Sequence, residues 1–200
     1  DTGVPHPDLL VFGIYSEDQR YLKRWGNVLA AGRHLVTTMG TDCHRNTFTA
    51  ILEDGERGDS YRRMMIAFSN HVRARPLPDG SFDDRVIKEA LAAGRNYGVF
   101  EMVGSPVGFD ARAEKGAAVY EMGDTAPLGA TFVVDAPQVR DLDPQAEAPA
   151  ITLRVLRATA DDAGFEEVAR TTEARLTAPL DAPGAYRAEV RILPWHLREH

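Results

Sequence analysis

The sequence has very little cysteine and no long apolar run. Cys43 is the only cysteine among 200 residues, so no disulfide can form within the chain. No apolar run approaches the roughly 20 residues that a helix needs to cross a bilayer, and the first residues lack the basic and apolar regions of a signal peptide. We therefore expect no membrane partner. The compartment stays open between the cytoplasm and export after processing.

Positive charge is also scarce. The chain has 23 Lys and Arg against 30 Asp and Glu, which gives a formal net charge of −7. The negative net charge predicts no nucleic-acid partner, because proteins that bind nucleic acids need a basic surface to contact the phosphates. The motifs G-x-S-x-G, G-x-x-x-x-G-K-[ST] and G-x-G-x-x-G are missing too. The overall composition, with 44% hydrophobic and 26% charged residues, is typical of a folded soluble protein.

In the first half of the chain, the pattern predicts helices that alternate with strands. Residues 17–31 carry apolar side chains at helical spacing, and residues 34–39 form a short apolar run that predicts a buried strand. A capping box predicts a helix over residues 81–94, with a further strand after it. Residues 62–72 fit either a helix or a strand. Such alternation is typical of α/β folds.

From about residue 105 the pattern changes to strands separated by Pro, Gly and Asp turns. Three segments have the composition or the alternation of strands, namely residues 128–136, 151–158 and 184–193. Residues 165–177 fit either a helix or a hairpin. The sequence therefore predicts an α/β domain over residues 1–104, followed by an all-β, sandwich-like domain over residues 105–200.

Asp42 and His44 follow the predicted strand at residues 34–39. Their i, i+2 spacing points both side chains the same way in an extended backbone. A carboxylate beside an imidazole suits Zn, Mn or Fe. Two interpretations stay open: the pair binds a metal, or Asp42 caps a polar turn and His44 lies on the surface. Cys43 would face the other way and pack inside, and His71 ends an apolar run without a motif.

Three stretches resemble the polymerase-and-histidinol-phosphatase (PHP) metallohydrolases, in particular their carbaryl-hydrolase-like (CehA/McbA-like) branch: residues 20–46, 83–100 and 183–190. In that family a tryptophan helix leads into a strand that ends in G-[ST]-D-x-H, whose Asp and His bind the catalytic metals. The motif stands here at residues 40–44. The resemblance implies the C-terminal part of a PHP-type β/α barrel and a metal-dependent hydrolase that cleaves a phosphoester or a carbamate or amide in a small-molecule substrate.

The resemblance also assigns individual residues. Asp42 and His44 would be ligands of divalent metal ions, namely Zn, Mn or Fe. Arg45 and Asn46, directly after them, would contact the substrate or support the ligands, unless they only cap the turn. His6, in a His-Pro pair, resembles a further metal-ligand motif of the family.

The sequence departs from the family in ways that bear on activity. It has no H-x-H motif, from which the family takes most of its ligands, and Phe12 and Gly13 stand where a ligand glutamate would be expected. The chain also starts at Asp1 without a methionine, so we expect a processed chain or a portion of a longer protein. Two ligands hold an ion weakly, so we expect the chain alone to be catalytically silent.

The alternative is a non-catalytic binding or interaction protein that keeps a degenerate metallohydrolase scaffold. The missing ligands favour this alternative. An incomplete barrel would also expose sheet edges and apolar surface, which predicts a homo-oligomer.

Overall fold

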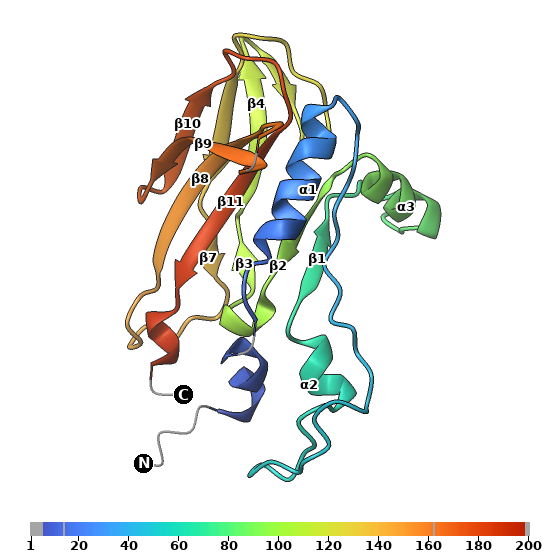
Figure 1. Ribbon diagram of the computed structural model, residues 1–200, viewed down its shortest axis with the longest axis vertical. Coiled ribbons are helices and arrows are strands. Elements are labelled where there is room, and N and C mark those ends of the chain that lie inside the picture. The colour runs from blue at the N-terminus through green and yellow to red at the C-terminus, as the bar shows by residue number, and fades with distance from the viewer. Residues whose placement is uncertain (1–5, 14, 162, 199–200) are drawn as a thin grey trace.

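The computed structural model describes residues 6–13, 15–161 and 163–198, and strands dominate it (Figure 1). Its helices are short: α1 (Gln19–Ala30), α2 (Tyr61–Met65) and α3 (Asp84–Ala92). Turns of 3-10 helix lie at Pro7–Gly13, Glu101–Val103 and Trp195–Leu197. The strands are β1 (Ser69–Val72), β2 (Asn96–Val99), β3 (Pro106–Val107), β4 (Asp110–Lys115), β5 (Ala118–Tyr120), β6 (Thr131–Asp135), β7 (Gln138–Val139), β8 (Ala150–Ala158), β9 (Phe165–Thr171), β10 (Arg175–Pro179) and β11 (Tyr186–Leu193). None of the described helices has the length and apolar character needed to span a membrane.

The predicted fold class, an α/β domain that forms the C-terminal part of a β/α barrel, is wrong. Such a barrel is built from parallel strands that alternate with helices. Here β1 and β2 form an antiparallel ribbon, and the other strand pairs among the described residues are antiparallel as well. The run at residues 62–72 is divided between α2 and β1. Small antiparallel sheets therefore stand where the barrel was expected.

The extended segment, residues 34–39, was predicted as a strand but joins no sheet. The amide side chain of Asn70 binds both backbone groups of Met39, with N–H···Oδ1 and Nδ2–H···O distances of 2.8 Å. Nδ2 of Asn96 donates to the carbonyl of Thr37 at 3.0 Å. The side chains of Asn70 and Asn96 thus form hydrogen bonds with backbone groups that would otherwise pair with a neighbouring strand.

The ribbon of β1 and β2 has two distinct faces. Asn70 lies opposite Gly98 in the register, and Asn96 is two residues from Gly98, so all three share one face. Gly98 lacks a side chain where Met39 lies, because a Cβ there would overlap the Met39 side chain. The extended segment therefore crosses this face, and the opposite face carries His71.

The predicted helix at residues 17–31 is confirmed as α1. The side chain of Asp18 caps it by accepting the backbone N–H of Arg20 at 2.9 Å. Gly32 follows the C-terminus with a φ of 77°, a left-handed conformation that glycine adopts without strain. Local sequence signals therefore define both ends of this helix.

Although α1 precedes the first strand, it packs on the β-rich half of the chain (Figure 1). Gly26 lies directly on Gly164, in the turn between β8 and β9, where a Cβ on Gly26 would overlap the Gly164 carbonyl. Beside this contact the rings of Trp25 and Phe165 have centroids 5.2 Å apart. The absence of a side chain at residue 26 thus permits the close approach.

The predicted helix at residues 81–94 is present as α3, but it begins later than expected. Oδ1 of Asp83 accepts the N–H of Val86 at 2.9 Å, so Asp83 is the cap and Ser81 is not. The strand expected after this helix is β2.

The second half holds a two-stranded ribbon, β3-β7, and two larger sheets that pack against each other, with strand orders β10-β6-β4-β5 and β11-β8-β9. The strands predicted at residues 128–136, 151–158 and 184–193 are confirmed as β6, β8 and β11. The ambiguous run at residues 165–177 forms β9 and the start of β10. Between the sheets lies a core of buried side chains, namely Val134, Leu153, Val155, Leu176 and Ala178.

Candidate functional site

Asp42 and His44 lie close together just beyond the extended segment. Nε2 of His44 is 3.5 Å from Oδ2 of Asp42, and the side chains are 48% and 94% exposed. The backbone is not extended here as expected, because Asp42 has a φ of 49°. This left-handed conformation, which Asp tolerates better than most residues, bends the backbone shortly before the turn at residues 45–46. The pair therefore forms an open, solvent-facing site.

The other ring nitrogen of His44 also has a partner. Nδ1 lies 3.2 Å from Oγ1 of Thr47. In the tautomer whose Nδ1–H donates to this hydroxyl, Nε2 keeps its lone pair and directs it toward the side of Asp42. Metal-binding histidines commonly fix their tautomer in this way. The arrangement therefore presents an imidazole nitrogen and a carboxylate oxygen to the same space.

A buried carboxylate, Asp59, fixes the turn that carries Thr47. Its side chain is 0% exposed. It accepts the backbone N–H groups of Thr47 at 3.0 Å and Phe48 at 3.2 Å, and Nε of Arg57 at 2.8 Å. The hydrogen bond from Arg57 is the main reason why the pKa of Asp59 falls to about 2. Sequence reasoning missed Asp59, because it lies in a polar segment that carries no motif.

Arg45 and Asn46 lie in the turn after His44, and both are exposed. The Arg45 guanidinium is 5.9 Å from the centroid of the Tyr61 ring, and its carbonyl accepts Nη2 of Arg57 at 3.1 Å. Arg45 also borders a shallow pocket of about 440 Å³ with Tyr61. These positions leave the Arg45 side chain accessible next to the Asp42 and His44 pair. Cys43, expected to be buried, is half-buried, with Sγ 4.0 Å from the Tyr61 carbonyl.

His6 is exposed, and its Nδ1 accepts the backbone N–H of Asp8 at 3.2 Å. Within the described part of the chain, the one group of three or more acidic, His or Cys side chains that could jointly hold an ion is Asp8, Asp54 and Glu56. His6 therefore does not complete a three-ligand site with Asp42 and His44 there.

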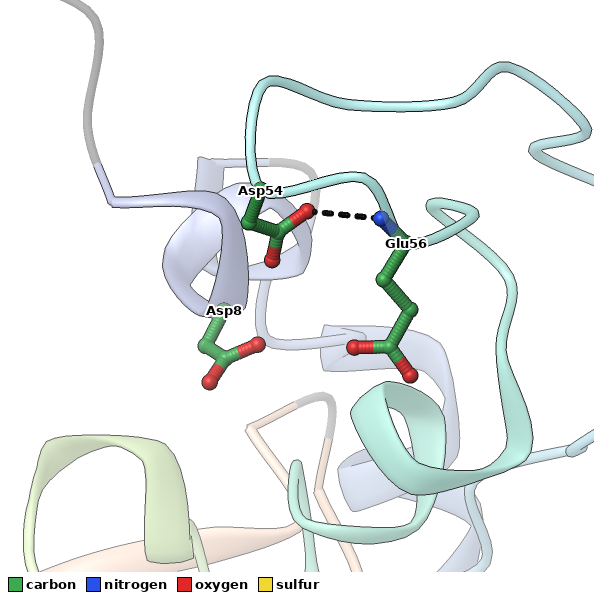
Figure 2. Close-up of side chains that lie close together, drawn as sticks. All are labelled: Asp8, Asp54 and Glu56. Atoms are coloured by element: carbon green, nitrogen blue, oxygen red, sulfur yellow. Dashed lines mark hydrogen bonds between the residues drawn. The ribbon is translucent and has the colours of Figure 1, made fainter.

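The acidic group of Asp8, Asp54 and Glu56 joins the start of the chain to the loop before α2 (Figure 2). Two guanidinium groups already occupy it. Arg63, whose side chain is 0% exposed, donates to Asp54 at 2.6 Å and to Asp8. Arg62 donates to Asp8 at 2.8 Å and to Glu56. Hydrogen bonds from these arginines are the largest cause that lowers the pKa of each carboxyl. The group is therefore an ion-pair network that holds the loop.

A second polar cluster lies on the His71 face of the β1–β2 ribbon. Nε2 of His71 is 2.7 Å from Oε1 of Glu101, and its Nδ1 is 3.2 Å from the Tyr97 hydroxyl. Ser69 and Ser105 also donate to Glu101. Burial raises the pKa of Glu101, but these hydrogen bonds outweigh burial and leave it below its usual value. Sequence reasoning missed this cluster, because only the pairing of β1 with β2 brings His71 beside Tyr97.

No family model matches the sequence, and neither the curated proteins nor the solved structures contain a significant match.

Proposed function

We propose that this chain is a portion of a metal-dependent hydrolase that resembles the CehA/McbA-like PHP enzymes, and that Asp42 and His44 are two of its metal ligands. One observation carries the proposal: Nε2 of His44 lies 3.5 Å from the Asp42 carboxylate, while Nδ1 lies 3.2 Å from Thr47. Each ring nitrogen therefore has a distinct role, one toward the ion and one toward a supporting hydroxyl.

The donor set fits a divalent ion of borderline character. A carboxylate oxygen and an imidazole nitrogen together suit Zn, Mn or Fe. When bound, such an ion lowers the pKa of a water molecule and polarises the scissile bond of a small-molecule phosphoester, carbamate or amide. His44 and Asp42 would hold it, and Thr47 would fix the ring of His44.

Two protein ligands are fewer than the three or four that metal sites commonly use. The chain alone would therefore bind the ion weakly and turn over no substrate. The exposed side chains of Arg45 and Asn46 flank the pair and would contact the substrate.

A second candidate function is that of a non-catalytic binding protein. A cavity of about 1730 Å³ lies between α1, the extended segment and the two sheets of the second half. Neither Asp42 nor His44 is among the described residues that line it. This concave surface is thus separate from the candidate metal ligands, and it supports a binding function.

Titration with Mn²⁺ or Zn²⁺, followed by calorimetry, tests the first proposal. We expect Asp42→Asn and His44→Gln to weaken binding at least about tenfold, because each removes one of two ligands. Glu53→Gln is the matched control, since it removes one negative charge from an exposed residue in the following loop. If all three variants and the wild type bind equally, Asp42 and His44 are not ligands and the binding function is favoured.

A further inference from the structure

The cavity of about 1730 Å³ follows the free edge of a strand. β11 pairs with β8 on one side and stands at the edge of its sheet in the described structure. Residues 182–192 all line the cavity. Successive side chains of a strand point to opposite faces of the sheet, so a cavity that touches consecutive residues lies along the strand's edge. Unpaired backbone groups therefore face it.

The cavity is a slot with two chemically different sides. Toward the core, the side chains of Tyr186, Ala188 and Val190 pack against the buried cluster between the sheets. Toward α1, Arg187 contacts Trp25. A strand paired with β11 would place its own alternate side chains in the same two environments. Its sequence would therefore alternate apolar and polar residues.

The far wall of the slot is the extended segment together with Gly94 and residues 96–100. Figure 1 shows α1 beside β11 and the β1–β2 ribbon beyond it. This wall and the sheets of the second half line the same cavity, so the edge of a second folded sheet would have to enter between them. A single extended chain needs far less room. The walls thus favour one strand over the edge of a second copy.

Size argues against a small molecule. Pockets for such ligands commonly enclose about 300 to 1,000 Å³, whereas this slot encloses about 1730 Å³. A free strand edge is also the surface to which extended peptides add by β-augmentation, since it offers unpaired N–H and C=O groups in register.

Arg187 supplies a charge preference. Its guanidinium lies 4.5 Å from the ring centroid of Phe165 and 5.6 Å from that of Trp25. Its Nε is buried and lacks a hydrogen-bond partner among the described residues, while Nη2 is 3.2 Å from Glu189. Burial lowers the pKa of Arg187, because the buried guanidinium cation has lost part of its hydration. A carboxylate opposite Arg187 would offset that loss.

We infer that the slot binds one extended strand from a partner polypeptide, which adds to the free edge of β11. The strand has apolar side chains at alternate positions, directed toward the core, and a carboxylate opposite Arg187. This interaction is independent of the proposed hydrolase function, because it uses neither Asp42 nor His44.

A peptide with the sequence of β11, YRAEVRIL, is a suitable probe because it has this chemistry. Paired antiparallel with its alanine opposite Ala188, it places its glutamate opposite Arg187 and its first arginine opposite Glu189. Its tyrosine then lies opposite Val190. Over the five pairs that this register forms with β11, apolar residues meet apolar residues and opposite charges meet.

Trp25 lines the slot and reports binding. The chain has 2 tryptophans, so Trp195→Phe leaves Trp25 as the single fluorophore. We expect a saturable change in its fluorescence with peptide concentration and slower amide hydrogen exchange in β11. Two N-methylated peptides, modified at odd or at even positions, provide matched controls. In one of these peptides the methylated amides face β11, and it should bind at least tenfold more weakly than the parent. In the other they face away from β11, and it should bind as the parent does.

The charge preference is tested separately. A peptide with lysine in place of its glutamate should bind at least tenfold more weakly, and Arg187→Gln should remove that difference. Arg170→Gln is the control, since Arg170 lies on β9 at the other edge of the sheet, does not line the slot and pairs with Glu167 at 3.1 Å. If Arg187→Gln does not fold, the comparison of the two peptides on the wild type still decides the charge preference.

Three results would overturn the inference. The first is the absence of saturable binding, and the second is equal binding of both N-methylated sets and the parent. The third is a concentration-dependent dimer in sedimentation with β11 amides protected without peptide, which would assign the edge to a second copy of the chain.

Discussion

Oγ1 of Thr47 lies 3.2 Å from Nδ1 of His44, so a hydroxyl outside any sequence motif sets the orientation of a candidate metal ligand. The contact depends on a turn that Asp59 closes from the far end of its loop. The geometry of the candidate site therefore depends on this loop as well as on the two residues that would bind the ion.

Thr47→Val should weaken binding of Mn²⁺ or Zn²⁺. Valine keeps the shape of the side chain but cannot accept the Nδ1 proton, so the imidazole loses its preferred tautomer and orientation. Loss of such a partner commonly lowers metal affinity about 10- to 100-fold. Thr47→Ser keeps the hydroxyl and should bind nearly as the wild type does. Calorimetric titration measures both, and equal affinity of the valine and serine variants would contradict the assigned role.

Gly26→Ala should destabilise the protein. Alanine is the better helix former by up to about 1 kcal/mol, but its Cβ would overlap the Gly164 carbonyl. Backbone cannot move aside as a flexible side chain can, and overpacking of this kind costs about 1–3 kcal/mol. Denaturant unfolding measures the change in the free energy of unfolding.

Gly40→Ala is the matched control for this change, because a Cβ there meets nothing within 4 Å and its φ is not left-handed. We expect it to unfold within about 0.5 kcal/mol of the wild type, as surface substitutions usually do. Equal losses at Gly26 and Gly40 would show that α1 does not approach the β8–β9 turn closely.

Asp59 should make the stability of the protein depend on pH in acid. Its pKa is about 2 in the folded protein and 3.8 ordinarily. The unfolded chain therefore binds the proton more readily, and the stabilisation by the carboxylate is complete above the ordinary value. It decreases as the pH falls below 3.8 and is lost below about 2. Acid-unfolding curves of the wild type and Asp59→Asn should differ above pH 5 and converge toward pH 2.

An unchanged difference between the two curves from pH 5 to pH 2 would contradict the lowered pKa. Asp181→Asn serves as the control, because Asp181 is exposed and its carboxylate forms no hydrogen bond or ion pair with the described residues.

Local signals in the sequence were enough to predict α1 and several strands. The cap at Asp18, the apolar spacing within α1 and the alternation in β8 and β11 lie within a few residues of the structure they specify. The extended segment was misassigned because its backbone partners, Asn70 and Asn96, are distant in the sequence. A run of β-branched residues shows strand propensity but does not show which groups will pair with it.

For the candidate site, too, only the features that adjacent residues determine could be predicted from the sequence. Adjacency in the sequence predicted that Asp42 and His44 lie together, but the backbone between them is not extended, because Asp42 has a left-handed conformation. Thr47 could have been suspected from its position after the motif. Asp59 could not, because its role follows from a loop that returns to the motif and leaves no periodic signal.

The packing of α1 on the turn between β8 and β9 has a consequence for cooperativity. The sequence changes character near residue 105, yet α1 comes from before this point and its contact with Gly164 lies beyond it. The change in composition therefore does not prevent α1 from packing on strands that lie beyond it. Because the Trp25 and Phe165 rings contact each other, we expect opening of α1 to expose both and to weaken the β8–β9 turn as well as the helix.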